Sequence, residues 1–173
     1  MSMMLALEGC DKTLKSLFAE RLTHLLHVPT YKNKGEWSSK LDSSTYWRDL
    51  LEFGGTFLID FMEQVRPSVI LDRFYPSEWV YSQVFNRETN FEVLRWMDER
   101  FNAMGGIIIL FRRRSYQGFV DDLHVEIDAT MLERLDAKYE EFKSWTKCRV
   151  VEVWLETEDL QKETDYIIQQ VLM

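Results

Sequence analysis

A short polar loop between an apolar run and an amphipathic segment carries residues suited to phosphate chemistry. In the stretch LALEGCDKTLKSLFAERL, residues 5 to 22, Gly9, Lys15 and Ser16 match three positions of the pattern GxxxxGK(S/T). In that pattern, backbone N–H groups and a helix N-terminus hold a phosphate, the lysine reaches its outer oxygens, and the hydroxyl helps to hold Mg²⁺. The sequence therefore predicts a phosphate-binding loop, with Lys15 facing solvent at the helix start. The alternative is a plain strand-to-helix turn with exposed lysines.

One position of this loop departs from the pattern. Leu14 stands where the second glycine is expected. If the backbone at this position is left-handed, a leucine costs about 1–2 kcal/mol. Two outcomes stay open: the leucine strains a working loop and crowds the phosphate, or it packs inward against the first helix and reshapes the loop.

Further charged residues stand at the end of another apolar run. Asp72 and Arg73 close the stretch SVILDR. Transfer of a phosphoryl group between two anions depends on cations that collect both phosphates and keep them in line. Lys12, Lys15 and Arg73 can gather near the carboxyl ends of adjacent parallel strands, where open α/β sheets bind ligands. For Asp72 and Arg73, the alternative is a salt bridge at the strand end.

The elements that position these residues alternate along the chain. Four short apolar runs, MMLAL, SVILD, GIIILF and RVVEVWL, are typical of strands buried in a parallel sheet, and VPTY is a weaker fifth candidate. Helical spacing follows in residues 14–25 and 132–142, and residues 45–65 are expected to form one or two helices, with FGG as a possible break. The alternation predicts one domain over residues 1–173 with a three-layer α/β fold.

Composition limits the class of protein. The 173 residues are 46% hydrophobic and 14% aromatic, which is ample for a core. The net charge of −8 argues against a general polyanion binder, although a local basic groove stays possible. Two cysteines, no leader and no run long enough to span a bilayer predict a protein of the reducing cytoplasm. The histidines lack metal-ligand spacing, so Mg²⁺ brought in with a nucleotide is the only metal expected.

The two motifs together resemble those of the thymidylate kinase family of nucleoside monophosphate kinases. The stretch EGCDKTLKS is similar to the family's EGxD(K/R)xGK(S/T), and DRFYPSEWVY is similar to its DRY followed by a serine and an aromatic residue, with Phe74 in place of the tyrosine. Small phage-encoded relatives have a similar compact form. The resemblance implies a P-loop kinase fold with a five-stranded parallel sheet, a short lid near residues 112–126, and ATP and Mg²⁺ as cofactors.

The resemblance also implies roles for individual residues. Lys15 would hold the donor's outer phosphates, Lys12 would stabilise the transferring group, Arg73 would grip the acceptor's phosphate, and Asp11 would face its sugar hydroxyl. Asp72 would either hold Arg73 or reach the metal, which Ser16 also serves. The full donor loop comprises Gly9, Cys10, Asp11, Lys12, Thr13, Leu14, Lys15, Ser16 and Leu17. In the lid segment FRRRSYQGF, Arg112 and Arg113 are candidate catalytic cations and Arg114 a donor contact, although solvated arginines are the commoner outcome.

The acceptor site is expected to use aromatic and polar residues from several segments. Relatives place a basic residue after the second strand, where Lys32 and Lys34 are candidates. The remaining candidates wall the acceptor or contact its base: Tyr46, Trp47, Asp72, Phe74, Ser77, Tyr81 and Gln83. Other aromatic residues are assigned to the core, namely Phe57, Phe61, Trp96, Phe101, Phe142 and Trp154.

Three functions therefore compete. The first is a nucleoside monophosphate kinase acting on a deoxynucleotide, with a thymidylate-like pyrimidine preferred. The second keeps the fold and chemistry but phosphorylates another acceptor, such as a modified base in DNA, against which the acidic charge weighs. The third is a nucleotide-binding relative that has lost catalysis. A homodimer is possible, and a membrane partner is not expected.

Overall fold

A computed structural model describes residues 2–32, 54–118, 127–155 and 159–173 of the chain. Five parallel strands form one sheet in the order β2-β3-β1-β4-β5. Their bounds are Met4–Glu8 for β1, Thr30–Lys32 for β2, Val69–Asp72 for β3, Ile107–Arg112 for β4 and Arg149–Trp154 for β5. The predicted five-stranded parallel sheet is confirmed, including the weak second strand.

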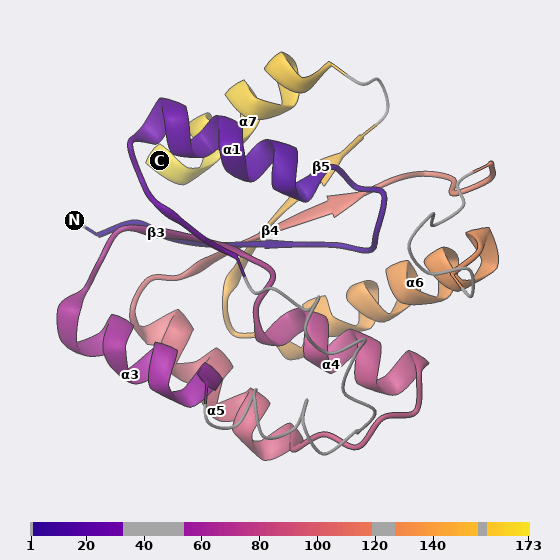
Figure 1. Ribbon diagram of the computed structural model, residues 1–173, viewed down its shortest axis with the longest axis horizontal. Coiled ribbons are helices and arrows are strands. Elements are labelled where there is room, and N and C mark those ends of the chain that lie inside the picture. The colour runs from indigo at the N-terminus through magenta and orange to yellow at the C-terminus, as the bar shows by residue number, and fades with distance from the viewer. Residues whose placement is uncertain (1, 33–53, 119–126, 156–158) are drawn as a thin grey trace.

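Helices cover both faces of this sheet, which makes the predicted three-layer α/β fold. The described helices are α1 (Lys15–Leu26), α3 (Thr56–Val65), α4 (Tyr75–Val84), α5 (Phe91–Ala103), α6 (Ala129–Trp145) and α7 (Leu160–Leu172). Figure 1 shows α1 and α7 on one face, with α3, α4, α5 and α6 on the other. Two clusters of buried apolar side chains fill the spaces between the layers. The predicted helical region 45–65 is described only from residue 54.

The central strand β1 is buried along its whole length because it has neighbours on both edges and helices on both faces. Its register places Leu7 beside Asp72 of β3, and Glu8 beside Leu110 of β4. The carboxyl ends of β1, β3 and β4 therefore meet at one edge of the sheet, where the sequence predicts the site.

Helix starts differ in a way that matters for ligand binding. Asn90, Asp128 and Asp159 cap α5, α6 and α7 by accepting hydrogen bonds from backbone N–H groups of the first turn. Helix α1 begins instead after Leu14, whose side chain provides no such bond, and α3 and α4 likewise begin without a side-chain cap. The first-turn N–H groups of α1 lack a side-chain cap, a condition that suits an anionic ligand.

The core assignments of the aromatic residues are confirmed in part. Phe101 and Phe142 are fully buried, and Trp96 packs partly against the same cluster. Three assignments are wrong: Phe57, Phe61 and Trp154 are 72%, 45% and 41% exposed. Helix α3 turns the opposite face, with Ile59 and Met62, toward the core, and Trp154 lies on the edge strand β5.

Candidate functional site

The loop between β1 and α1 begins at a position that only glycine can occupy. Gly9 has a φ of 134°, and a Cβ atom there would lie 2.3 Å from the carbonyl oxygen of Phe111 in β4. Neither the backbone conformation nor the space admits a side chain. The first glycine of the predicted phosphate loop is thus fixed by the approach of the neighbouring strand.

Leu14 takes the left-handed conformation that its position in the pattern predicts. Its φ and ψ are 57° and 19°, and Lys12 is also left-handed, with a φ of 63°. The Leu14 side chain packs against the apolar cluster between the sheet and helices α1 and α7. Leu14 thus combines the left-handed backbone of the first alternative with the apolar packing of the second.

Lys15 is buried, so the expectation that it faces solvent is wrong. Only 6% of the residue is exposed, and its Nζ donates to the carbonyl oxygen of Cys10 and, at 3.0 Å, to Oγ1 of Thr13. The loop wraps around the amine because Thr13 Oγ1 also donates to the Cys10 carbonyl oxygen, at 2.7 Å. Burial lowers the pKa of Lys15 to about 7. The amine thus lies inside the loop, and a large fraction of it is neutral at physiological pH.

Ser16 and Asp72 come together as the sequence predicts for a metal site. Ser16 Oγ donates to Oδ2 of Asp72 at 2.8 Å, and Lys32 Nζ lies 3.8 Å from the same carboxylate oxygen. Lys32 also donates to Ser16 Oγ at 3.3 Å. Oxygen atoms are the ligands that Mg²⁺ prefers, so the hydroxyl of Ser16 and the carboxylate of Asp72 fit this ion chemically. Among the described residues, no cluster of three His, Cys, Asp or Glu side chains could hold a metal alone.

Arg73 is bound to the phosphate loop. Its Nη1 donates to the Gly9 carbonyl oxygen at 3.3 Å and to Ser77 Oγ at 3.2 Å, and its Nη2 pairs with Oδ1 of Asp11. Tyr81 completes the group: its ring lies 5.1 Å below the guanidinium, and its hydroxyl donates to Oδ2 of Asp11 at 2.9 Å. The carboxylate partner of Arg73 is therefore Asp11 of the loop, whereas Asp72 binds Ser16 and Lys32.

Glu8 supports this arrangement, although the sequence analysis gave it no role. Its carboxylate is fully buried and accepts hydrogen bonds from the backbone N–H of Phe74, from Ser77 Oγ and from the Tyr139 hydroxyl. Burial raises the pKa of Glu8. Since Ser77 also contacts Arg73, Glu8 helps to fix the start of α4 beneath the arginine. A charged residue closing an otherwise apolar strand is the signal that could have identified it.

The predicted lid arginines have different surroundings. Arg112 is the last residue of β4, and its guanidinium binds the carboxylates of Asp136, Glu140 and Glu152 and lies 4.7 Å from the centre of the Trp154 ring. This network ties β4 to α6 and β5, so the structure does not bring Arg112 to the phosphate loop. Arg113 does approach the loop: its Nε donates to the Lys12 carbonyl oxygen at 2.8 Å. Arg114 is exposed.

Several other predicted contacts lie away from this group or outside the described residues. The Leu17 side chain is 39% exposed on α1, and Gln83 Nε2 donates to the Trp79 carbonyl oxygen of its own helix at 2.8 Å. Phe74 is a core residue, packed edge-on against Tyr75 and Phe101 because the chain turns inward at the start of α4. Lys34, Tyr46, Trp47 and the lid beyond residue 118 lie outside the described residues.

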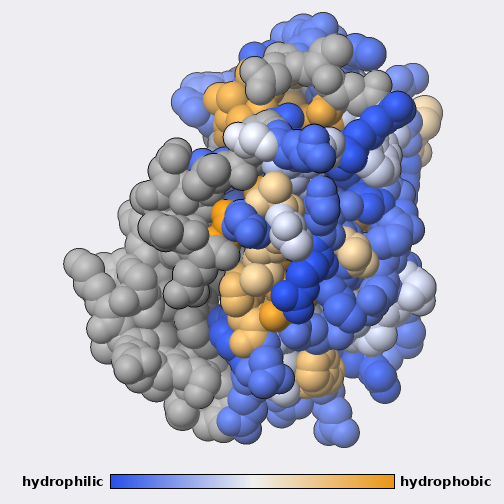
Figure 2. All heavy atoms as spheres, turned by 90° about the vertical axis from the view of Figure 1, so that its right-hand side faces the viewer, coloured by the Kyte–Doolittle hydropathy of each residue, from blue (hydrophilic) through white to orange (hydrophobic). Residues whose placement is uncertain are grey.

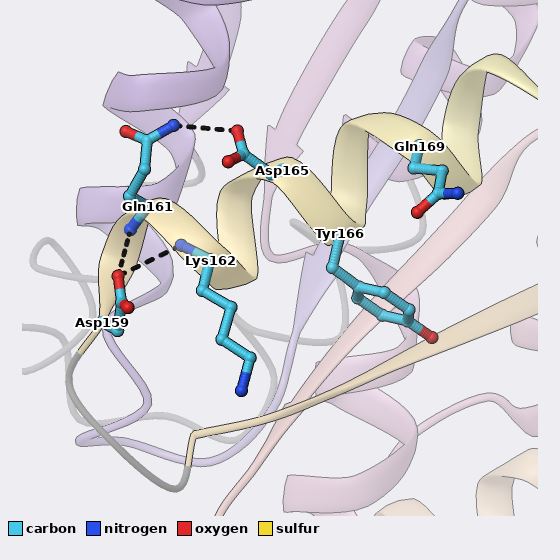
Figure 3. A pocket seen from close by; sticks show the side chains of 6 residues that line it. All are labelled: Asp159, Gln161, Lys162, Asp165, Tyr166 and Gln169. Carbon is cyan, nitrogen blue, oxygen red and sulfur yellow. Dashed lines mark hydrogen bonds between the residues drawn. The ribbon is translucent and has the colours of Figure 1, made fainter.

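Two further features lie on the surface of the molecule. Figure 2 shows the side of the molecule toward which β4 points in Figure 1, where a band of hydrophobic residues crosses a largely hydrophilic face. A separate hollow lies along α7 and is lined by Asp159, Gln161, Lys162, Asp165, Tyr166 and Gln169 (Figure 3). None of these six residues belongs to the predicted site: five come from α7, and Asp159 is its N-cap.

Comparison with known proteins establishes the fold. No protein-family model and no curated protein sequence matches the chain. Among solved structures, YorR from Bacillus subtilis, in complex with phosphorylated GDP, is 19% identical, with a TM-score of 0.67 over 98% of this chain and 95% of its own. The fold is that of the P-loop nucleoside and nucleotide kinases.

Two further structures agree. Deoxyadenosine kinase from M. mycoides, with the products dCMP and dCDP bound, is 18% identical, with a TM-score of 0.64 over 98% of this chain and 99% of its own. Thymidylate kinase from Ehrlichia chaffeensis is 15% identical, with a TM-score of 0.62 over 99% of each chain. In the described part of the chain, no helix combines the length and apolar character needed to cross a bilayer.

Proposed function

We propose that the chain is a nucleoside monophosphate kinase that transfers the terminal phosphate of ATP to a deoxynucleotide, with a thymidylate-like pyrimidine as the preferred acceptor. The proposal depends mainly on the placement of Lys15 and Arg73 against one loop. Lys15 donates to the Cys10 carbonyl oxygen, and Arg73 donates to the neighbouring Gly9 carbonyl oxygen. Two basic side chains held by adjacent peptide groups, with Lys15 charged when a phosphate binds beside it, can bring two phosphates into line, which is the main requirement of phosphoryl transfer.

On the donor side, the loop from Gly9 to Leu17 and the uncapped start of α1 would hold the phosphates of ATP. Lys15 would turn from the Cys10 carbonyl oxygen to the outer phosphates, and Lys12 and Arg114 would add positive charge. Ser16 and Asp72 would hold Mg²⁺, which neutralises charge on the phosphates when bound.

On the acceptor side, Arg73 would exchange Asp11 for the acceptor's phosphate. A guanidinium binds two phosphate oxygens side by side, a geometry that a lysine cannot reproduce. Asp11, held in place by the Tyr81 hydroxyl, would then accept a hydrogen bond from the sugar of the acceptor. Lys32 lies next to Asp72 and would stay close to both phosphates.

Structural neighbours support kinase chemistry in general. One was solved with dCMP and dCDP and another with phosphorylated GDP, so this fold accommodates both pyrimidine and purine nucleotides. The preference for a thymidylate-like pyrimidine rests on the resemblance of the EGCDKTLKS and DRFYPS motifs. Two free, buried cysteines are compatible with action in the cytoplasm.

A second candidate is a nucleotide-binding relative without catalysis. The observation that favours it is the state of the loop: Leu14 occupies the position of a glycine, and Lys15 is turned inward and buried. Catalysis would need the buried amine to leave its two loop partners. If that exchange is too costly, the chain would bind nucleotides without transferring phosphate.

Thermal shift with a panel of ligands tests nucleotide binding. A ligand at a hundred times its dissociation constant stabilises the folded state by about 2.7 kcal/mol, or about 5–10 °C for a chain of this size. We expect this shift with ATP and Mg²⁺, and separately with dTMP. Lys15→Met should reduce the shift with ATP, and Arg73→Lys should reduce the shift with dTMP. Equal shifts for every variant would place the nucleotides elsewhere.

A further inference from the structure

The segment that follows β4 contacts the phosphate loop at two points. Arg113 donates to the Lys12 carbonyl oxygen, and the hydroxyl of Tyr116 accepts a hydrogen bond from the thiol of Cys10 at 2.9 Å. Cys10 and Tyr116 are both buried, at 0% and 2% exposure. Both contacts therefore join the segment after β4 to the loop between β1 and α1.

The hydrogen bond from the Tyr116 hydroxyl to Asp136 determines the direction of the Cys10–Tyr116 hydrogen bond. The Tyr116 hydroxyl donates to Oδ1 of Asp136 at 3.1 Å, and Asp136 is held by two hydrogen bonds from Arg112. A carboxylate only accepts, so the Tyr116 proton points to Asp136 and the phenol oxygen is left to accept from the thiol. Burial raises the pKa of the Cys10 thiol to about 11, so the thiol keeps the proton that it donates.

Cys10 in turn determines where Lys15 lies. Its carbonyl oxygen is the acceptor for Lys15 Nζ and for Thr13 Oγ1. The side chain and the carbonyl group belong to one residue, so a thiol held by Tyr116 restricts rotation of the peptide that aims the lysine. Three residues from three segments are thereby linked: Tyr116 to Cys10, and Cys10 to Lys15.

We propose that Tyr116 is a positioning residue for Lys15: it holds the Cys10 thiol, and through it the carbonyl group against which the lysine rests. This role also joins the segment 113–118, which carries Arg113 and Arg114, to the donor loop. The kinetic consequence rests on the proposed kinase function, whereas the link between Tyr116 and Cys10 does not.

Alkylation of the two cysteines tests the link without nucleotide. We expect Tyr116→Phe to raise the rate of Cys10 alkylation by iodoacetamide about threefold to tenfold, since one buried hydrogen bond restrains the loop, while Cys148 stays unchanged. Tyr75→Phe is the matched control, because Tyr75 is a buried tyrosine that bonds Asp98 and lies 3.5 Å from Cys148 Sγ. Tyr75→Phe should raise the alkylation rate of Cys148 and leave that of Cys10 unchanged. An unchanged Cys10 rate in Tyr116→Phe, or a parallel rise at both cysteines, would overturn the proposal.

Steady-state kinetics then test the effect on Lys15. Tyr116→Phe and Cys10→Ala should each lower kcat/KM for ATP about threefold to tenfold, and the double variant should lose no more than either alone. Cys10→Ser keeps a side-chain hydrogen-bond donor, so it should retain most activity when Tyr116 is present. In the Tyr116→Phe background, Cys10→Ser should be no more active than Cys10→Ala. Additive losses, or an equal loss in Tyr75→Phe, would refute the positioning role. Absence of transfer by the unaltered chain would refute the proposed function, and the alkylation rates would still decide the role of Tyr116.

Discussion

At the scale of single residues, the loop combines a strained backbone with a buried cation. Leu14 is left-handed and packed inward, and Lys15 is enclosed by the carbonyl and hydroxyl groups of its own loop. Both features act on the same helix start. Their separate contributions can be measured by substitutions that remove one effect at a time.

Leu14 allows strain and packing to be separated. Leu14→Ala removes the packed side chain but keeps a Cβ in the left-handed region, whereas Leu14→Gly removes the side chain and the strain together. We expect the alanine variant to have the lower free energy of unfolding in urea, by about 1 kcal/mol relative to the glycine variant. If alanine is equal to glycine or more stable, the conformation at position 14 is not strained.

The buried Lys15 predicts a pH dependence of nucleotide binding. With a pKa of about 7, the amine is mostly neutral at pH 8, and a bound phosphate favours its charged form. ATP binding at pH 8 should therefore take up nearly one proton more than at pH 6. Calorimetry in two buffers of different ionisation enthalpy measures this number. The arginine in Lys15→Arg is always charged, so this variant should take up no additional protons at pH 8. If it takes up as many additional protons as the unaltered chain, another group binds them.

At the scale of elements, apolar runs predicted β1, β3 and β4 because strands buried on both faces admit few polar residues, whereas the exposed strand β2 gave only the weaker signal VPTY. The loop at Gly9 could be predicted because its glycine and the following Lys-Ser pair are close in sequence. The group around Cys10 could not, because Tyr116 and Asp136 come from segments 106 and 126 residues away along the chain.

Errors in the sequence analysis have a similar cause. The family resemblance places Arg112 in the lid that follows the fourth strand, but β4 continues through Arg112, which meets carboxylates of α6 and β5. Lys15 was expected in solvent because a lysine at a helix start is usually exposed. Only the path of the loop, which folds its carbonyl groups over the amine, reveals the burial.

At the scale of the whole molecule, an acidic chain gathers cations at one edge of its sheet. The net charge is −8, yet Lys15, Lys32, Arg73 and Arg113 all contact the phosphate loop or its neighbour Asp72. Arg73 and Lys32 are paired there with the carboxylates of Asp11 and Asp72, so positive charge is confined to a small area, which suits a small anionic ligand better than a long polyanion. The fold and the charge distribution thus agree with a kinase of small nucleotides.

Phosphate transfer from ATP to a nucleoside monophosphate at this loop can be measured directly. The protein is incubated with γ-labelled ATP, Mg²⁺ and dTMP, and parallel reactions contain dCMP, dAMP or dGMP in place of dTMP. Chromatography then shows which nucleotide carries the label. We predict labelled nucleoside diphosphate, most rapidly from dTMP, and loss of transfer in Lys15→Met without loss of the folded state. Binding of ATP with no label reaching any of the four acceptors would refute the proposed nucleoside monophosphate kinase activity.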